Sequence, residues 1–182
     1  SQLPTWFKKR IKSWDKKHRE KFIQTISKQP NIHLVFKNAE DLQKIKIKSI
    51  KTSDCSASIL NSLSIKEILG FKEGFWWVQD FSAMMPLYLT DNISNKITAD
   101  LCAAPGGKSF QLINYGAKVK AFEKDKNRAE IMKTNLLRLK LDCKLEIKNV
   151  LDINDKQKFD LIILDAPCSS IGTIRRHPEI FF

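Results

Sequence analysis

Asp100-Leu101-Cys102-Ala103-Ala104-Pro105-Gly106-Gly107-Lys108-Ser109 stands where a predicted strand passes into a predicted helix. Its small residues and paired glycines let the backbone approach a ligand closely, because no Cβ atoms stand in the way. The N–H groups that open the following helix favour a negatively charged partner, such as a carboxylate. We therefore expect this glycine turn, residues 100–109, to bind a small ligand.

The end of the glycine turn, Gly107-Lys108-Ser109, also copies the last positions of a P-loop. A P-loop needs another glycine five residues before Gly107, and Cys102 stands there. The sequence therefore argues against a P-loop.

Strands and helices alternate around and after the glycine turn. The predicted strands are 97–101, 118–122, 145–150 and 159–164, and the predicted helices are 108–115 and 126–140. The last strand is an almost continuous apolar run, which is typical of burial on both faces. In the second helix we expect Ile131, Leu136 and Leu139 to face the core. The alternation predicts an α/β fold with a doubly wound parallel sheet, whose ligands bind at the carboxyl ends of its strands.

The first third of the chain has a different pattern. Residues 4–28 repeat apolar side chains at helical steps between basic ones, which predicts one or two amphipathic helices. Residues 32–36 are β-rich, 39–44 predict a short helix, and further strands are expected around 45–50 and 56–60. The adjacent Trp76 and Trp77 are expected to divide between core and surface. We expect a small α+β subdomain with basic N-terminal helices over 1–73 and a ligand-binding domain over 74–182.

Composition narrows the class of protein. The chain has 182 residues, of which 42% are hydrophobic, and this is enough for a buried core. No apolar run approaches the roughly 18 residues of a membrane helix, and no signal peptide is recognisable, so cytoplasm is the expected compartment. The cysteines are widely spaced, which predicts reduced thiols rather than a zinc site or a disulfide framework.

Positive charge is concentrated near the N-terminus. The formal net charge is +12, and the stretch from Lys8 to Lys21 contains eight Lys or Arg but only two acids. Such a surface attracts polyanions, although a charge run is by itself more often a solvated helix face.

Two acids follow predicted strands. Glu123 comes after the second strand, where nucleoside-binding sheets place the acceptor for ribose hydroxyls. Asp165 opens the block Asp165-Ala166-Pro167-Cys168-Ser169-Ser170 after the last strand, at the same sheet edge as the glycine turn. The alternatives are an ordinary loop acid for Glu123 and a structural cysteine for Cys168.

Three stretches together resemble the Sun/Fmu family of RNA cytosine-5 methyltransferases: DLCAAPGGKS, VQDFSA from Val78, and DAPCSSIGTIRRHPEI from Asp165. The resemblance implies a Rossmann-like sheet and S-adenosyl-L-methionine as cofactor. No metal is expected. By this resemblance Glu123 takes the ribose, Asp165 closes the site, and a third acid, near the adenine, falls on Asn149. Asparagine can still form hydrogen bonds, and Asp152 is the alternative. The residues that the resemblance places around the methionine end are Cys102, Ala103, Ala104, Pro105, Gly106, Gly107 and Lys108.

The resemblance also implies a covalent mechanism. A cysteine thiolate adds to carbon 6 of the cytosine, so that carbon 5 becomes enamine-like and accepts the methyl group. The family places that nucleophile in a Thr-Cys-Ser segment, which we expect beyond Phe182, so that the chain would bind cofactor without being active. Cys168 then assists loss of the carbon 5 proton, and Asp165 hydrogen-bonds the base. Two alternatives stay open: Cys168 as the nucleophile, and a non-catalytic RNA-binding fragment.

The resemblance further names the partner. The Arg175-Arg176-His177-Pro178 stretch is similar to members that act on bacterial 16S rRNA, and a monomer is the favoured oligomeric state. Arg175, Arg176 and His177 are candidates for gripping an RNA whose target base is flipped out, although an ordinary exposed loop is the alternative.

Overall fold

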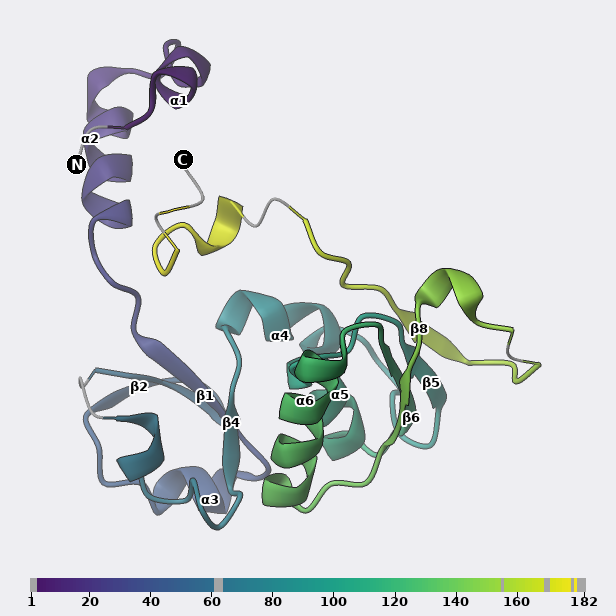
Figure 1. The fold of residues 1–182 in the computed structure, drawn as a ribbon. Coiled ribbons are helices and arrows are strands. Elements are labelled where there is room, and N and C mark those ends of the chain that lie inside the picture. The colour runs from purple at the N-terminus through teal and green to yellow at the C-terminus, as the bar shows by residue number, and fades with distance from the viewer. Residues whose placement is uncertain (1–2, 61–63, 155, 169–170, 178, 180–182) are drawn as a thin grey trace. The chain divides into compact units, whose positions relative to one another are not determined.

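The chain is described by a computed structural model that covers residues 3–60, 64–154, 156–168, 171–177 and 179. It forms two compact units, one made of Ser1–Pro30 with Pro167–Phe182 and the other of Asn31–Ala166 (Figure 1). The division expected between residues 73 and 74 stays a prediction, because these units reflect compactness and not function. Among the described residues, no helix has both the length and the hydrophobicity that crossing a bilayer requires.

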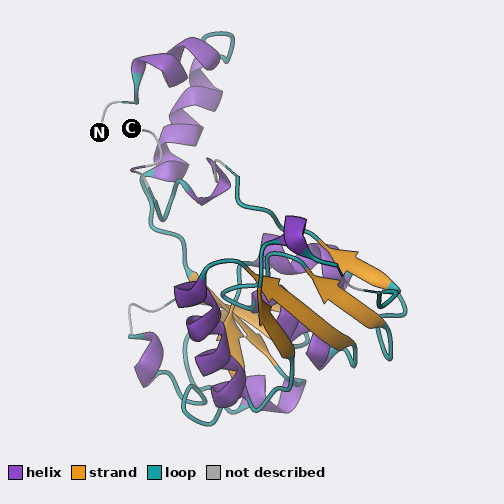
Figure 2. Cartoon of the chain, turned by 45° about the vertical axis from the view of Figure 1, so that its right-hand side comes forward, coloured by secondary structure: helices purple, strands orange, loops and turns teal. Residues whose placement is uncertain are grey.

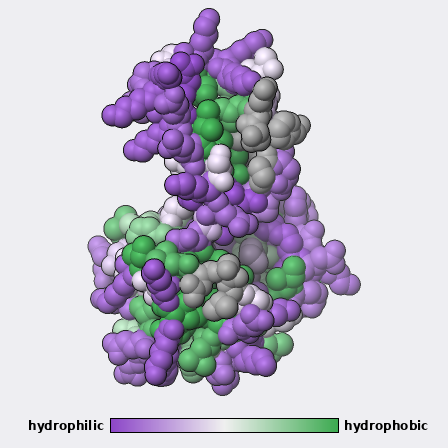
Figure 3. All heavy atoms as spheres, turned by 90° about the vertical axis from the view of Figure 1, so that its left-hand side faces the viewer, coloured by the Kyte–Doolittle hydropathy of each residue, from purple (hydrophilic) through white to green (hydrophobic). Residues whose placement is uncertain are grey.

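The first unit contains the two predicted amphipathic helices, α1 (Thr5–Arg10) and α2 (Lys16–Ile26). The carboxylate of Asp15 caps α2 by accepting a hydrogen bond from the His18 N–H at 2.9 Å. The rings of Phe7 and Phe22 stack with their centroids 5.4 Å apart. Ile174, just after the 3-10 helix η3 (Ile171–Thr173), joins the same small core. The visible face of these helices is largely hydrophilic, with a hydrophobic strip beside it (Figure 3).

The second unit begins with an antiparallel sheet in the order β2-β3-β1-β4. Its elements are β1 (Ile32–Phe36), α3 (Ala39–Gln43), β2 (Ser49–Ser53), β3 (Ser56–Ile59), the 3-10 helix η1 (Ile65–Glu67) and β4 (Trp76–Val78). The predicted α+β arrangement is confirmed. The strand expected around 45–50 starts only at Ser49, and β4 was not expected at all.

A parallel sheet follows, in the order β7-β6-β5-β8 (Figure 2). Its elements are α4 (Phe81–Tyr88), β5 (Ile97–Asp100), α5 (Gly107–Asn114), β6 (Lys118–Glu123), α6 (Lys126–Leu139), β7 (Lys144–Ile147), the 3-10 helix η2 (Val150–Asp152) and β8 (Leu161–Ile163). The predicted doubly wound α/β fold is confirmed. The chain runs from β5 through β6 to β7 in one direction and then returns to place β8 on the other side of β5. The carboxyl end of β5 is therefore a topological switch point, the usual place for a ligand in such sheets.

The strand β4 connects the cores of the two sheets. Successive side chains of a strand point to opposite faces, and both tryptophans of β4 are buried. Trp76 packs with Leu34 and Phe36 in the core of the antiparallel sheet. Trp77 packs in the other core, with its ring centroid 6.2 Å from that of Phe110. The expectation that this pair divides between core and surface is wrong, because β4 is covered on both faces.

Two further burial predictions are wrong. Ile131 is 54% exposed, because it lies about 100° around the helix from the face of α6 that is buried in the core. The residues of that buried face are Ala129, Met132, Leu136 and Leu139. The apolar run at 159–164 is not buried on both faces: Ile162 is 56% exposed, since β8 is an edge strand that pairs only with β5 among the described residues.

Candidate functional site

The glycine turn is held in place by both of its neighbouring strands. The Leu101 N–H donates to the Ile163 carbonyl at 2.9 Å, and the Ala103 N–H donates to the Phe122 carbonyl at 3.0 Å. Gly106 caps α5 with a φ of 114°, where a Cβ atom would lie 2.1 Å from Cζ of Phe110. Only glycine fits this position.

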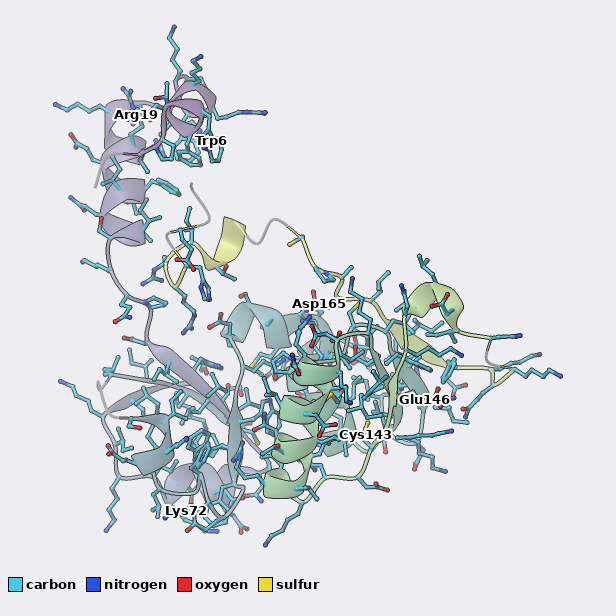
Figure 4. All side chains as sticks on the ribbon, in the orientation of Figure 1. Trp6, Arg19, Lys72, Cys143, Glu146 and Asp165 are labelled. Atoms are coloured by element: carbon cyan, nitrogen blue, oxygen red, sulfur yellow. The ribbon has the colours of Figure 1, made fainter. Side chains whose placement is uncertain are left out.

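A cavity of about 210 Å³ opens at the carboxyl end of β5, and its wall contains every residue from Cys102 to Lys108 except Gly106. Gly106 faces the Phe110 ring instead. Asp165 also lines this cavity and lies just beyond the arrowhead of β8 (Figure 4). The full lining is Val78, Gln79, Asp80, Ala83, Asp100, Cys102, Ala103, Ala104, Pro105, Gly107, Lys108 and Asp165.

Lys108 and Asp165 form an ion pair at the cavity mouth. Nζ of Lys108 donates to Oδ2 of Asp165 at 2.6 Å. The Lys108 side chain is mostly buried, whereas that of Asp165 is 63% exposed. The pair thus leaves the second oxygen of Asp165 accessible to a ligand in the cavity.

Asp100 lines the cavity but is not among the residues that the family resemblance assigned to the cofactor. Its side chain is almost fully buried, and Oδ2 accepts a hydrogen bond from the Ser109 hydroxyl at 2.7 Å. Oδ1 has no hydrogen-bond partner among the residues that the structure describes. Burial raises the pKa of Asp100. A carboxylate at the end of a buried strand, at the head of the glycine turn, was the available signal.

Gln79 forms a rigid wall of the cavity. Its Oε1 accepts a hydrogen bond from Nε1 of Trp77 at 2.8 Å, and its Nε2 donates to Oε1 of Gln111 at 2.9 Å. Gln111 in turn donates to the Met84 carbonyl at 3.0 Å. These buried amides connect β4, α4 and α5 behind the glycine turn. Nothing in the local sequence marks this role, because it depends on partners that lie far apart in the chain.

Glu123 lies at the carboxyl end of β6, next to the glycine turn but outside the cavity wall. It is 3% exposed, and Oε1 accepts from the Asp125 N–H at 3.0 Å. Oε2 lies 3.6 Å from Nη1 of Arg128 and has no hydrogen-bond partner within the described part of the chain.

Burial raises the pKa of the Cys102 thiol, and the charges of Glu123 and Asp100 raise it further.

The other predicted site residues are not in the cavity wall. Asn149 is exposed and caps η2 by accepting from the Leu151 N–H at 3.1 Å, and Asp152 is exposed too. Cys168 is exposed and belongs to the first unit. In that unit Nε of Arg175 donates to the Lys28 carbonyl at 3.1 Å, and Nδ1 of His177 lies 2.9 Å from Oε1 of Glu179. The roles expected for all of these residues stay predictions.

No cluster suited to a metal ion is present among the described His, Cys, Asp and Glu side chains.

Comparisons with known proteins agree with this arrangement. Residues 87–182, more than half of the chain, match the model of the family described as 16S rRNA methyltransferase RsmB/F. A probable ribosomal RNA small subunit methyltransferase B of Coxiella burnetii is 30% identical over 97% of this chain and 46% of its own length. The chain spans about half the length of the curated relatives it matches.

Solved structures share the fold. A methyltransferase homolog protein from Pyrococcus horikoshii matches with a TM-score of 0.70 at 25% identity, over 96% of this chain and 67% of that one. The crystal structure of PH0851 matches with a TM-score of 0.85 at 24% identity, over 98% of this chain and 44% of that one. The sheet is therefore that of the Rossmann-like methyltransferases, and the chain belongs to the RsmB/F family of 16S rRNA methyltransferases.

Proposed function

We propose that this chain supplies the S-adenosyl-L-methionine site of an enzyme that methylates carbon 5 of a cytosine in 16S rRNA. In this proposal residues 74–182 bind the cofactor, and residues 1–73, with the basic helices α1 and α2, bind RNA. The observation that carries it is the pair of buried carboxylates, Asp100 and Glu123, on either side of the glycine turn. Each has an oxygen without a hydrogen-bond partner among the described residues.

The chemistry of the cavity fits the amino-acid end of this cofactor. Ligand pockets usually measure about 300–1,000 Å³, so a cavity of about 210 Å³ accommodates one end of a large ligand and not the whole. Oδ1 of Asp100 is an acceptor for an ammonium group, because a buried carboxylate oxygen without a partner is unfavourable. The first N–H groups of α5 favour a carboxylate.

The nucleoside end fits the β6 side of the glycine turn. Oε2 of Glu123 is an acceptor for a ribose hydroxyl, at the strand end where nucleoside-binding sheets use an acid. Asn149, or Asp152 in the alternative assignment, takes the adenine. Both follow β7, the next strand along the same edge.

The bound cofactor supplies a methyl group on a sulfonium. A cysteine thiolate first forms a bond to carbon 6 of the cytosine. Carbon 5 would then take the methyl group from the sulfonium, whose sulfur–methyl bond breaks to leave S-adenosyl-L-homocysteine. Loss of the carbon 5 proton lets the bond between sulfur and carbon 6 break, which regenerates the thiolate and releases 5-methylcytosine. Cys168 assists the proton loss, and Asp165, held by Lys108, hydrogen-bonds the base.

Equilibrium dialysis of the chain against labelled S-adenosyl-L-methionine tests the proposed cofactor. We expect saturable binding that S-adenosyl-L-homocysteine displaces and ATP does not. Absence of saturable binding, or displacement by ATP alone, would contradict the proposal.

The role of Cys168 is tested with an RNA that carries 5-fluorocytidine, whose carbon 5 bears fluorine in place of the proton, so that the covalent adduct cannot break down. A covalent complex that disappears in Cys168→Ala would make Cys168 the nucleophile and contradict the release role. The matched control is Cys143→Ala, because burial raises the pKa of Cys143 to about 12 and keeps its thiol protonated. An affinity for RNA that falls as the salt concentration rises, and that does not change when the cofactor is added, would instead indicate a non-catalytic RNA-binding chain.

A further inference from the structure

Arg128 connects the two halves of the proposed cofactor site. Its Nη2 donates a hydrogen bond to the carbonyl of Ala104 in the glycine turn. Its Nη1 lies 3.6 Å from Oε2 of Glu123, at the end of the neighbouring strand. A planar guanidinium can serve two acceptors at a fixed spacing, which an ammonium cannot do. Arg128 thus sets the distance between a backbone carbonyl of the turn and a buried carboxylate.

The helix itself does not favour a cation at this position. Arg128 lies in the first turn of α6, and its N–H donates to Oδ1 of the capping Asp125 at 2.9 Å. The N-terminal end of a helix carries partial positive charge, so acidic side chains are the favourable ones there. The first turn of α6 contains none. A residue that breaks a local rule is expected where function requires it.

The contact also leaves Glu123 suited to bind a ligand. A buried carboxylate is unfavourable unless a charge or hydrogen bonds compensate it. Oε1 accepts from the Asp125 N–H, and Arg128 offers a positive charge to Oε2 at a distance longer than a hydrogen bond. Oε2 therefore keeps its capacity to accept from a hydroxyl group.

We propose that Arg128 is a positioning residue of the cofactor site, which holds Glu123 and the Ala104 carbonyl in the geometry that binds the ribose end. This inference rests on the proposed function, because it assumes that Glu123 accepts a hydrogen bond from a ribose hydroxyl. It assigns to Arg128 no contact with the reacting atoms.

The test is a double-mutant cycle on the chain, with the unreactive S-adenosyl-L-homocysteine as probe in isothermal titration calorimetry. We expect Arg128→Ala to weaken binding about tenfold, the usual effect of losing a hydrogen bond to a charged group. Arg128→Ala introduced into Glu123→Gln should weaken binding less than about threefold further, because the residue acts through Glu123. If the role of Arg128 were merely structural, the losses of affinity caused by Arg128→Ala and by Glu123→Gln would multiply in the double variant. This result would overturn the inference.

Two more variants control the cycle. Lys133→Ala removes a cation from the outer face of α6, where Lys133 pairs with Glu130 at 2.7 Å, and should leave the affinity unchanged. Arg128→Lys keeps the charge but cannot serve both acceptors, so we expect an affinity between those of the parent and Arg128→Ala. This variant keeps the test usable if Arg128→Ala does not fold. Full affinity in Arg128→Lys or in Arg128→Ala would overturn the inference, whereas a parent chain that does not bind the probe would contradict the proposed function itself.

Discussion

The β6 end and the β8 end of the site contain the same kind of group in different surroundings. Glu123 is 3% exposed and held by Asp125 and Arg128, whereas Asp165 is 63% exposed and paired with Lys108 alone among the contacts described. β6 lies inside the sheet, and β8 lies at its edge. A carboxylate fixed before the ligand arrives loses little entropy on binding, so the β6 end should contribute more to cofactor affinity. The exposed end is more accessible to a second, larger substrate.

Gly106→Ala should have the largest effect of the substitutions proposed, because the glycine turn joins the β6 end and the β8 end of the site. The new Cβ would overlap the Phe110 ring and force a left-handed φ on alanine. Together these effects cost about 3 kcal/mol, which lowers the melting temperature by roughly 6–12 °C, and cofactor binding should be lost. Differential scanning fluorimetry measures the shift. Gly172→Ala is the control, since no atom of the described residues lies within 4 Å of its added Cβ, and an equal shift there would refute the explanation.

Glu123→Gln should weaken cofactor affinity by about 10- to 100-fold, since it removes the charge from the buried acceptor. Titration calorimetry with S-adenosyl-L-homocysteine measures the loss. Glu130→Gln changes an exposed acid of α6, the helix that follows β6, and should have no effect. If Asp165→Asn weakened binding more than Glu123→Gln did, this would contradict the claim that the β6 end contributes more to cofactor affinity.

Asp100→Asn should weaken cofactor affinity about tenfold and change how stability depends on pH. Burial raises the pKa of Asp100 in the folded state, so the fold binds this proton more tightly than the unfolded chain does. The contribution of Asp100 to stability therefore falls as the pH rises from its unfolded pKa through its folded pKa. Asparagine stays neutral, so the stability of the variant relative to the parent should increase as the pH rises above the unfolded pKa of Asp100 and through its raised folded pKa. Urea denaturation at several pH values measures this, and a pH-independent difference would be evidence against it.

Asp165→Asn should have the smallest effect. An exposed ion pair contributes about 0.2–1 kcal/mol, which corresponds to an affinity loss of less than about fivefold and a melting temperature within about 4 °C of the parent. The small effect should shrink further at high salt, because solvent ions screen the pair with Lys108. A loss that persists in 1 M salt would show that the β8 end is as rigid as the β6 end.

The parts of this molecule that the sequence predicts well are those that local rules specify. The parallel sheet follows from the alternation of strands and helices, and the glycine turn follows from Gly106, whose conformation no other residue adopts easily. Asp165 was correctly expected beside that turn, because the carboxyl ends of parallel strands meet at one edge.

The parts that sequence reasoning missed depend on contacts between distant elements. Trp76 and Trp77 are both buried because β4 lies between two cores, which no local pattern reveals. Gln79 and Arg128 owe their positions to partners on other elements, and each is an ordinary polar residue in its own segment. The burial of β8 was overestimated, since an apolar run does not show whether its strand lies inside a sheet or at its edge.

The central claim is that the cofactor lies along the carboxyl edge of the parallel sheet, from the glycine turn to Glu123. Amide chemical-shift changes in two-dimensional NMR spectra of the labelled chain, recorded during titration with S-adenosyl-L-methionine, test it most directly. The account predicts the largest changes at residues 102–108 and 123–128, with small ones in the antiparallel sheet. Changes confined to α1 and α2, or no saturable change at residues 102–108, would contradict it.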